Sequence, residues 1–128
     1  MSNSDLTRIL IAAALLICPF LGSSLTYGQQ STEQFIPIGY SPGVSNKYTY
    51  IGSIVAVDRE AHTIVVQSNR GMRTIRVTPR TRIWLDRSKI EQTNLVASYS
   101  DCEEGRKVEI MHDRDDENVA DWIKIESK

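Results

Sequence analysis

The feature that most constrains the fold is a series of short β-type segments that begins at Lys47 and continues almost to the end of the chain. These segments are dense in Val, Ile, Thr, Tyr and Trp, which favour pleated strands, and turn residues interrupt them at short intervals. Five strands are expected, over residues 48–58, 62–68, 72–78 with a continuation over 81–85, 106–111 and 119–126. The sequence therefore predicts an all-β domain.

Apolar side chains that alternate along these segments define the inner face of the expected sheet. The inner set consists of Ile54, Val57, Ile64, Val66, Ile75, Val77, Ile83, Leu85, Val108, Ile110, Val119, Ile123 and Ile125. In the first segment, the spacing from Ile51 to the next inner residue breaks the two-residue period beside Gly52, which predicts a β-bulge. The turn Asn69-Arg70-Gly71 suits a hairpin, because Asn and Gly tolerate positive φ.

The order of the segments indicates an architecture. Three strands are followed by a connection over residues 86–102 with weak helical spacing, and two further strands complete the chain. This is the order of a small five-stranded OB-like barrel, with a short helix or an ordered loop between strands 3 and 4. An SH3-like barrel is the nearest alternative.

Residues 1–28 carry the pattern of a signal peptide. Arg8 precedes a run of 13 mostly apolar residues, 9–21, which is shorter than the ~20 residues of a membrane-spanning helix. Small residues flank Tyr27 and place signal cleavage before Gln29, with Ser24 as the second choice. No transmembrane segment is expected after cleavage, and an uncleaved anchor is the alternative. The mature protein is therefore expected to be periplasmic or secreted.

The remaining chain divides into two parts. Residues 29–46 mix Gln, Ser, Pro and Gly without a sustained period, which predicts a flexible linker. The apolar patch at 35–38 leaves open that this segment docks on the domain or on a partner. Residues 47–128 form the expected OB-like β-barrel domain.

Cysteine usage limits the redox chemistry. Cys18 lies in the signal peptide after Ile17, where lipoprotein processing prefers a small residue, so lipidation is not favoured. Cys102 is then the single cysteine of the mature chain, and no intrachain disulfide is expected. A redox-active thiol and an intermolecular bridge are alternatives to a small buried hydrophobe. No histidine lies near Cys102 in sequence to activate its thiol.

Charge is unevenly distributed, although the formal net charge is only −1. Residues 59–89 carry a net charge of +6, whereas residues 90–128 carry −6. An arginine face is the candidate ligand site, and the residues proposed for it are Arg73, Arg76, Arg82 and Trp84. Guanidinium groups would bind phosphate, sulfate or carboxylate, and the indole would stack on a base or sugar. The alternative is mutual neutralisation of basic and acidic strands.

Other constellations are weaker. The loop 113–118 is rich in carboxylates but lacks the Gly and the terminal Glu of an EF-hand calcium loop. His112 beside this loop is a weak zinc candidate, and His62 is expected to cap a turn. No nucleophile elbow, zinc-protease motif, phosphate loop or Cys/His pair is present, so no enzymatic activity, no catalytic residue and no cofactor are expected.

Several stretches resemble a family of bacterial secreted domains of unknown function. They are Gly52-x-Ile54-x-x-Val57-Asp58, Thr63-Ile64-x-Val66, Thr81-x-Ile83, Gly105-x-x-Val108-Glu109-Ile110 and Ala120-x-x-Ile123-x-Ile125. The resemblance covers about residues 50–126 and implies an exported OB-like fold. It implies no catalytic residue, because none is established for that family.

The layout is more distantly similar to the periplasmic copper-binding chaperones of efflux systems. Those proteins hold copper(I) with two methionines, a histidine and a tryptophan. Here Met72 and Met111 lie far apart in sequence, and Trp84 has no neighbouring methionine. The metal motif is absent, so no metal ligand is assigned.

Together these features predict an exported, non-enzymatic binding or structural module of the cell envelope. An anionic polysaccharide, a lipid head group or an envelope protein is the expected kind of partner. Nucleic acid is not expected, because an exported protein rarely meets it and the net charge is not basic. A periplasmic metal-handling protein is the alternative function.

Overall fold

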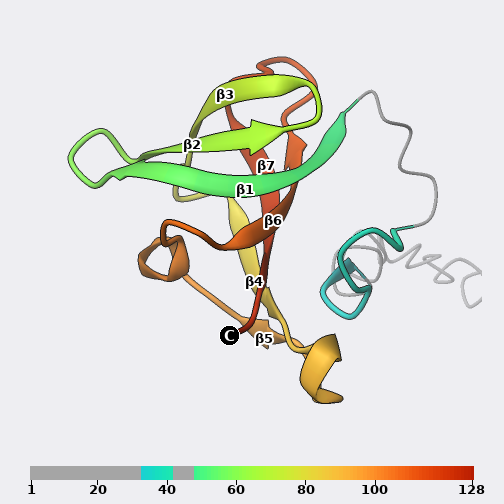
Figure 1. The fold of residues 1–128 in the computed structure, drawn as a ribbon. Helices are drawn as coiled ribbons and strands as arrows, with labels where there is room; N and C mark the ends of the chain where they lie inside the picture. Colours follow the sequence, from blue (N-terminus) through green and yellow to red (C-terminus); the bar gives the residue numbers. More distant parts are fainter. Residues whose placement is uncertain (1–32, 42–47) are drawn as a thin grey trace, which may run out of the picture.

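The fold is known from a computed structural model that describes residues 33–41 and 48–128 (Figure 1). Its strands are β1 (Thr49–Asp58), β2 (Thr63–Ser68), β3 (Gly71–Arg76), β4 (Arg82–Asp86), β5 (Leu95–Val96), β6 (Lys107–His112) and β7 (Ala120–Glu126). Two 3-10 turns, η1 (Ser88–Ile90) and η2 (Tyr99–Asp101), flank β5. The expected signal peptide lies outside the described residues. The all-β class is confirmed.

The strands form one seven-stranded sheet in the order β3-β2-β1-β6-β7-β4-β5. The pairings are antiparallel except for β4 with β7, which is parallel. The prediction of a closed five-stranded barrel is therefore wrong, because the sheet is open and has two more strands. The two-residue strand β5 and the turns η1 and η2 occupy the connection expected to hold a helix or ordered loop.

One of the two additional strands arises because the predicted third strand is divided into β3 and β4. Between them, the N–H of Thr81 donates to the carbonyl of Thr78 at 3.0 Å, and this turn redirects the chain around Pro79. As a result β3 pairs with β2, whereas β4 pairs with β7. The sheet still curls strongly, because the N–H of Arg76 donates to the carbonyl of Asn118 at 2.7 Å. This contact brings the end of β3 to the start of β7.

The core lies on the inner face of the curled sheet. Most of the predicted inward side chains are buried there, and the confirmed ones are Ile54, Ile64, Val66, Ile75, Val77, Ile83, Val108, Ile110, Ile123 and Ile125. Three others, Val57, Leu85 and Val119, are only partly buried. Val57 and Leu85 lie near the ends of β1 and β4 and still pack against the core, whereas Val119 lies just before β7.

The predicted β-bulge in β1 is confirmed. The pairing register with β2 shifts between Ile54 and Ala56. Nearby, a Cβ atom on Gly52 would lie 2.3 Å from the carbonyl oxygen of Gln67 and 2.7 Å from Cγ1 of Val66. Glycine is required here because the backbone of Gln67 on the paired strand β2 occupies the place of a side chain at the bend.

Residues 33–41, which belong to the segment predicted as a linker, pack against the outer face of the sheet and are called the strap below. The N–H of Ile38 donates to Oδ2 of Asp86 at 2.8 Å. Asn94 Nδ2 donates to the carbonyl of Gln34 at 2.7 Å. Ile38 itself is 9% exposed, which fits the alternative that the apolar patch docks on the domain.

A buried lysine completes the attachment of the strap. Lys124 on β7 is fully buried, and its Nζ donates to Oε2 of Glu33 at 3.0 Å and to Oγ of Ser41 at 2.8 Å. The ammonium group also lies 4.7 Å from the centre of the Trp122 ring. The strap therefore supplies the carboxylate and hydroxyl partners that a buried ammonium group requires.

Candidate functional site

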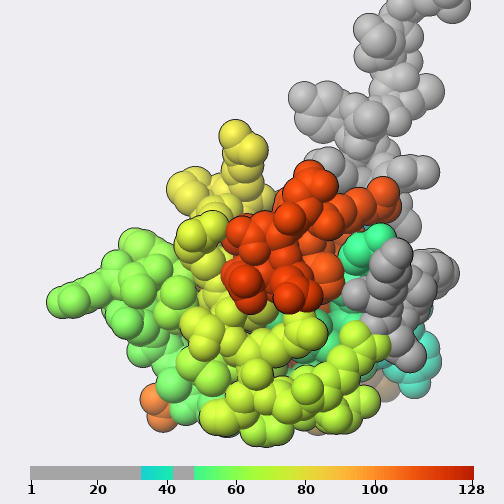
Figure 2. Space-filling model, turned by 90° about the horizontal axis from the view of Figure 1, so that it is seen from above, coloured from blue at the N-terminus to red at the C-terminus, as the bar shows by residue number. Residues whose placement is uncertain are grey.

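The predicted arginine face is not a single cationic patch. Arg73 and Arg76 are three positions apart on β3, so their side chains leave the strand on opposite faces. Arg73 Nη1 lies 3.9 Å from Glu117, and Arg76 Nη2 lies 3.6 Å from Asp116. Figure 2 shows the red-orange loop that supplies these acids packed against the yellow-green β3 region. These two arginines therefore fit the alternative interpretation, in which basic and acidic segments neutralise each other.

Arg82 and Trp84 lie elsewhere, on β4. Arg82 Nη2 donates to Oδ2 of Asp121 at 2.9 Å, and its guanidinium lies 5.8 Å from the centre of the Trp84 ring. Trp84 is only 5% exposed and lies beside Trp122, with ring centres 6.2 Å apart. The expectation that Trp84 stacks on a base or sugar is not met, because its ring is covered. Lys124 and Trp122 lie on the same outer face and are also buried.

Two carboxylates of the acidic loop 113–118 accept hydrogen bonds from the backbone of the loop itself. Oδ1 of Asp113 accepts the N–H groups of Asp115 at 2.8 Å and Asp116 at 3.1 Å. Oδ1 of Asp116 accepts the N–H of Asn118 at 2.9 Å. In the part of the chain that the structure describes, no group of three or more His, Cys, Asp or Glu side chains is placed to hold a metal ion.

Cys102 lies in the core and is fully buried. Burial raises the pKa of its thiol to about 12, although Arg59 acts in the opposite direction. The location favours the interpretation of Cys102 as a small buried hydrophobe, because the thiolate is the reactive form.

We expect Cys102 to resist iodoacetamide in the folded protein at about pH 8 and to react after unfolding in guanidinium chloride. Peptide mass mapping after each treatment measures the modification at this residue. Rapid alkylation of the native protein would contradict the burial and revive the redox-active interpretation.

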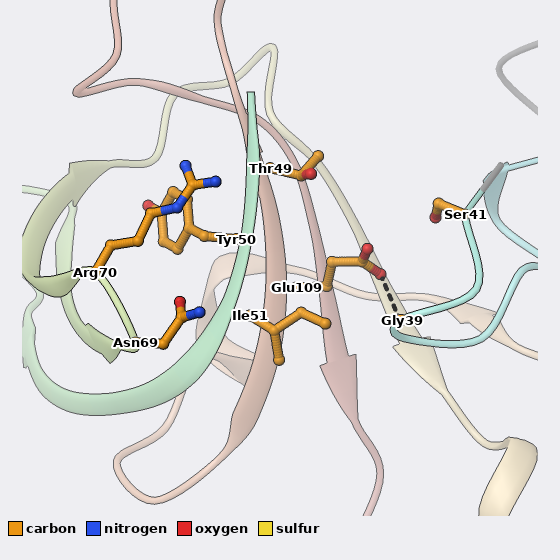
Figure 3. A pocket seen from close by; sticks show the side chains of 8 residues that line it. All are labelled: Gly39, Ser41, Thr49, Tyr50, Ile51, Asn69, Arg70 and Glu109. Carbon is orange, nitrogen blue, oxygen red and sulfur yellow. Dashed lines mark hydrogen bonds between the residues drawn. The ribbon is translucent and has the colours of Figure 1, made fainter. Parts of the chain in front are cut away.

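A polar cavity of about 470 Å³ lies between the strap, the start of β1 and the turn between β2 and β3 (Figure 3). Its lining consists of Gly39, Ser41, Thr49, Tyr50, Ile51, Asn69, Arg70 and Glu109. Figure 3 shows Tyr50, Asn69 and Arg70 on one side and Glu109, Gly39 and Ser41 on the other. These residues come from four segments that are far apart in the sequence.

Tyr50 is the least satisfied side chain of this cavity. It is 5% exposed, and its hydroxyl has no hydrogen-bond partner within residues 33–41 and 48–128. Burial raises the pKa of the hydroxyl, which keeps it protonated, against a smaller opposing effect of Arg73. The guanidinium of Arg73 lies 5.5 Å from the centre of the ring. An unsatisfied buried hydroxyl costs about 1–3 kcal/mol, so such a group marks a place for a ligand or an ordered water.

Glu109 forms the opposite wall. It is 3% exposed, and its Oε2 accepts the N–H of Gly39 at 3.1 Å. Burial raises the pKa of Glu109, and the neighbouring carboxylates of Glu33 and Asp86 act in the same direction. The Gly39 N–H and the ammonium group of Lys124 oppose this shift without cancelling it. Glu109 therefore gains a proton more readily than an exposed glutamate does.

The raised pKa of Glu109 leads to a pH-dependent prediction. The folded protein keeps this proton at pH values where the unfolded chain, with an ordinary pKa of 4.5, has lost it. Its contribution to the free energy of unfolding therefore falls as the pH rises through that range. We expect Glu109→Gln, which cannot ionise, to gain stability relative to the wild type between about pH 4 and pH 7.

Urea unfolding at several pH values, followed by tryptophan fluorescence, measures that difference. The exposed Glu104→Gln is the control, because its side chain is at the surface and the difference is expected to stay flat. A difference for Glu109→Gln that shrinks with rising pH would show that Lys124 and Gly39 outweigh burial.

The fold and the cavity define the protein as a small all-β module with a polar cavity beside an open, curled sheet. No helix within residues 33–41 and 48–128 is long and apolar enough to cross a membrane. No family model and no curated protein matches the chain. The resemblance to secreted domains of unknown function therefore gains no support.

Among solved structures, the chain is similar to two structures of the copper protein CusF. The first is a copper(II)-bound Escherichia coli CusF variant with a Trp-to-Ala substitution, at 16% identity and a TM-score of 0.40, and the match covers 63% of this chain and 91% of that chain. The other is silver(I)-bound CusF, at 15% identity and a TM-score of 0.42, covering 60% of this chain and 93% of that chain. The layout similarity to copper chaperones is thus found again, but at this overlap it assigns neither a family nor a function.

Proposed function

We propose that this protein is an exported, non-enzymatic binding module of the cell envelope, and that its polar cavity takes an anionic, hydroxyl-bearing ligand such as an acidic saccharide. The observation that carries the proposal is the buried Tyr50 hydroxyl, which has no hydrogen-bond partner among the described residues, in the wall of a cavity whose other lining side chains are polar except that of Ile51. The hydroxyl oxygen is itself shielded from solvent, so a ligand hydroxyl or carboxylate would satisfy it, and remove its desolvation cost, through an ordered water or a small movement of the cavity wall.

Charge supports an anionic ligand. Arg70 lines the cavity and forms no ion pair within the described residues, and Arg73 lies beside the Tyr50 ring. A guanidinium group binds a carboxylate through two parallel hydrogen bonds. Arg70 was not among the predicted ligand residues, and none of those four residues, Arg73, Arg76, Arg82 and Trp84, lines this cavity.

Hydroxyl recognition is supported by the remaining lining groups. Asn69 offers both a donor and an acceptor, and so does the hydroxyl of Thr49. The hydroxyl of Ser41 already donates to Oε2 of Glu33 at 3.1 Å and accepts from Nζ of Lys124. Glu109 accepts hydrogen bonds when ionised and donates one when protonated. A saccharide presents several adjacent hydroxyl groups, which suits such a mixed set.

Export and the absence of catalytic activity remain inferences from the sequence. The leader over residues 1–28 supports a periplasmic or secreted location. No catalytic motif is present in the sequence, and Cys102 is buried with a raised thiol pKa, which supports a binding role. A lipid head group or an envelope protein that carries acidic groups would use the same cationic contacts.

Titration of the mature protein with oligogalacturonate tests the proposal, with neutral maltose oligomers as the comparison ligand. We expect binding of the acidic oligomer alone, measured by calorimetry and by NMR shifts of the amides of Tyr50 and Arg70. Arg70→Ala is expected to weaken it about tenfold and Tyr50→Phe several-fold. Arg80→Ala, an exposed arginine outside the cavity, is the matched control. Equal losses in Arg70→Ala and Arg80→Ala would reduce the effect to general charge.

The metal-handling alternative predicts a different result. Native mass spectrometry of the protein recovered from its own host without chelators would then show excess mass equal to a metal ion. That result would move the search to His62, His112, Met111 and the loop 113–118. An apo protein that binds the acidic oligomer supports the proposed module.

A further inference from the structure

A second cavity, of about 560 Å³, lies on the other side of the molecule between the β1–β2 turn, the β3–β4 connection and the residues before η2. Its apolar lining includes Val77, Ile83, Ala97, Pro79 and the ring of Tyr99. Val77 and Ile83 are core residues with 6% and 5% exposure, so the cavity opens directly onto the hydrophobic core. Cavities of about 300–1,000 Å³ with apolar walls and few polar groups are typical of small-molecule sites.

The walls of this apolar cavity are held in place before any ligand binds. The hydroxyl of Tyr99 shares its one proton between the carbonyls of Asp58 at 2.8 Å and Thr63 at 3.0 Å. Arg59 Nη1 donates to the carbonyl of Tyr99 at 2.8 Å, and its guanidinium lies 4.8 Å from the centre of that ring. The N–H of Ala97 donates to the carbonyl of Ile83 at 2.8 Å. A preformed cavity lowers the ordering cost of binding.

The opposite wall depends on an unusual backbone conformation. His62 has a φ of 52°, in the left-handed region that few residues other than glycine adopt. Its carbonyl accepts the N–H of Val77 at 2.8 Å, and its ring lies 5.3 Å from that of Tyr99. The strained turn therefore places an imidazole ring at the edge of the cavity, beside the aromatic wall.

Arg76 supplies a charge at the rim of the cavity. Its side chain is 58% exposed, and its 3.6 Å pair with Asp116 is a partly exposed contact of little strength. The cavity is otherwise lined by neutral groups and by His62, and no carboxylate lines it. The hydroxyl of Thr81 is already used, because it donates to the carbonyl of Ala120 at 2.7 Å.

We propose that this apolar cavity binds a small aliphatic carboxylate, with the chain against Val77, Ile83 and Ala97 and the carboxylate on the guanidinium of Arg76. The apolar chain removes core surface from water, and the charge of Arg76 complements the acid. This site is separate from the polar cavity and does not depend on the function proposed for that cavity. It gives a role to Arg76, one of the arginines that the sequence singled out.

Octanoate, octanol and acetate are three probes that separate the contribution of the aliphatic tail to binding from that of the carboxylate charge. We expect saturable binding of octanoate, about tenfold weaker binding of octanol and no binding of acetate, followed by NMR shifts of the Val77 and Ala97 amides. Arg76→Gln should lower the affinity for octanoate to that for octanol. Arg80→Gln, the matched control, should change neither affinity.

Substitutions that fill the apolar cavity provide a second test of the proposal. Ala97→Phe should abolish binding of both octanoate and octanol, and Ala61→Phe at the exposed rim carries the test if Ala97→Phe fails to fold. Tyr50→Phe, in the polar cavity, should leave both affinities unchanged. Octanoate binding that survives the filling variants, or that acetate matches, would overturn the proposal.

Discussion

Replacing Lys124 by alanine is expected to lower the free energy of unfolding by about 3–5 kcal/mol, the range found when one partner of a buried ion pair is removed. The side chain is fully buried, and its ammonium group holds Glu33 and Ser41 of the strap. Its loss also leaves the buried Glu109 without the cation that faces it across the β6–β7 pair. Urea unfolding at neutral pH measures the change.

The same variant should release the strap. Hydrogen exchange at the amides of Ile38 and Gly39 is expected to accelerate, because their acceptors lie on the sheet beneath. Lys124→Met keeps most of the volume and isolates the effect of the charge, and Lys107→Ala on the exposed side of β6 is the control. A change below about 1 kcal/mol with unaltered exchange would show that the ion pair does not hold the strap.

Gly52→Ala is the second substitution with a large expected effect, a loss of about 3 kcal/mol or more of stability. The added Cβ would lie 2.3 Å from the carbonyl oxygen of Gln67, a backbone atom that cannot move without breaking the β1–β2 pairing. Thermal unfolding followed by circular dichroism measures the loss. The expected mechanism is a forced separation of the two strands at the bend.

Gly71→Ala is the matched control for this prediction. Gly71 has a φ of 96°, but no atom lies within 4 Å of the position of an added Cβ. The cost there is backbone strain alone, about 1–2 kcal/mol. Equal losses in the two variants would mean that conformational strain, rather than the close approach of Gln67, is the reason for glycine at position 52.

Strand positions and inner faces could be predicted because they depend on local alternation. Ile64 and Val66 on β2, and Ile123 and Ile125 on β7, are buried as their two-residue period indicates. The bulge beside Gly52 was also predictable, because a broken period is visible in one strand alone. Whether the sheet closes into a barrel could not be predicted. It depends on how the chain turns between residues 76 and 82, and on which strands β3 and β4 pair with.

The polar cavity was missed for a related reason. Tyr50, Arg70, Glu109 and Ser41 belong to four separate segments, and no spacing in the chain connects them. Arg73, Arg76 and Arg82 suggested a common face because they are close in sequence, but alternation and the turn at Pro79 separate them. Their acidic partners lie 39 to 44 residues away, so local charge counts could not show the pairing.

By itself, the sequence determined the all-β class, most of the strand segments, the bend in β1 and the apolar inner face of the sheet, because these follow from the conformational preferences of neighbouring residues. Only the tertiary structure decided that the sheet stays open, that the strap covers Lys124, and that residues from separate segments form a polar cavity and an apolar cavity. Those features arise from contacts between residues distant in sequence, whose partners are set by the path of the whole chain.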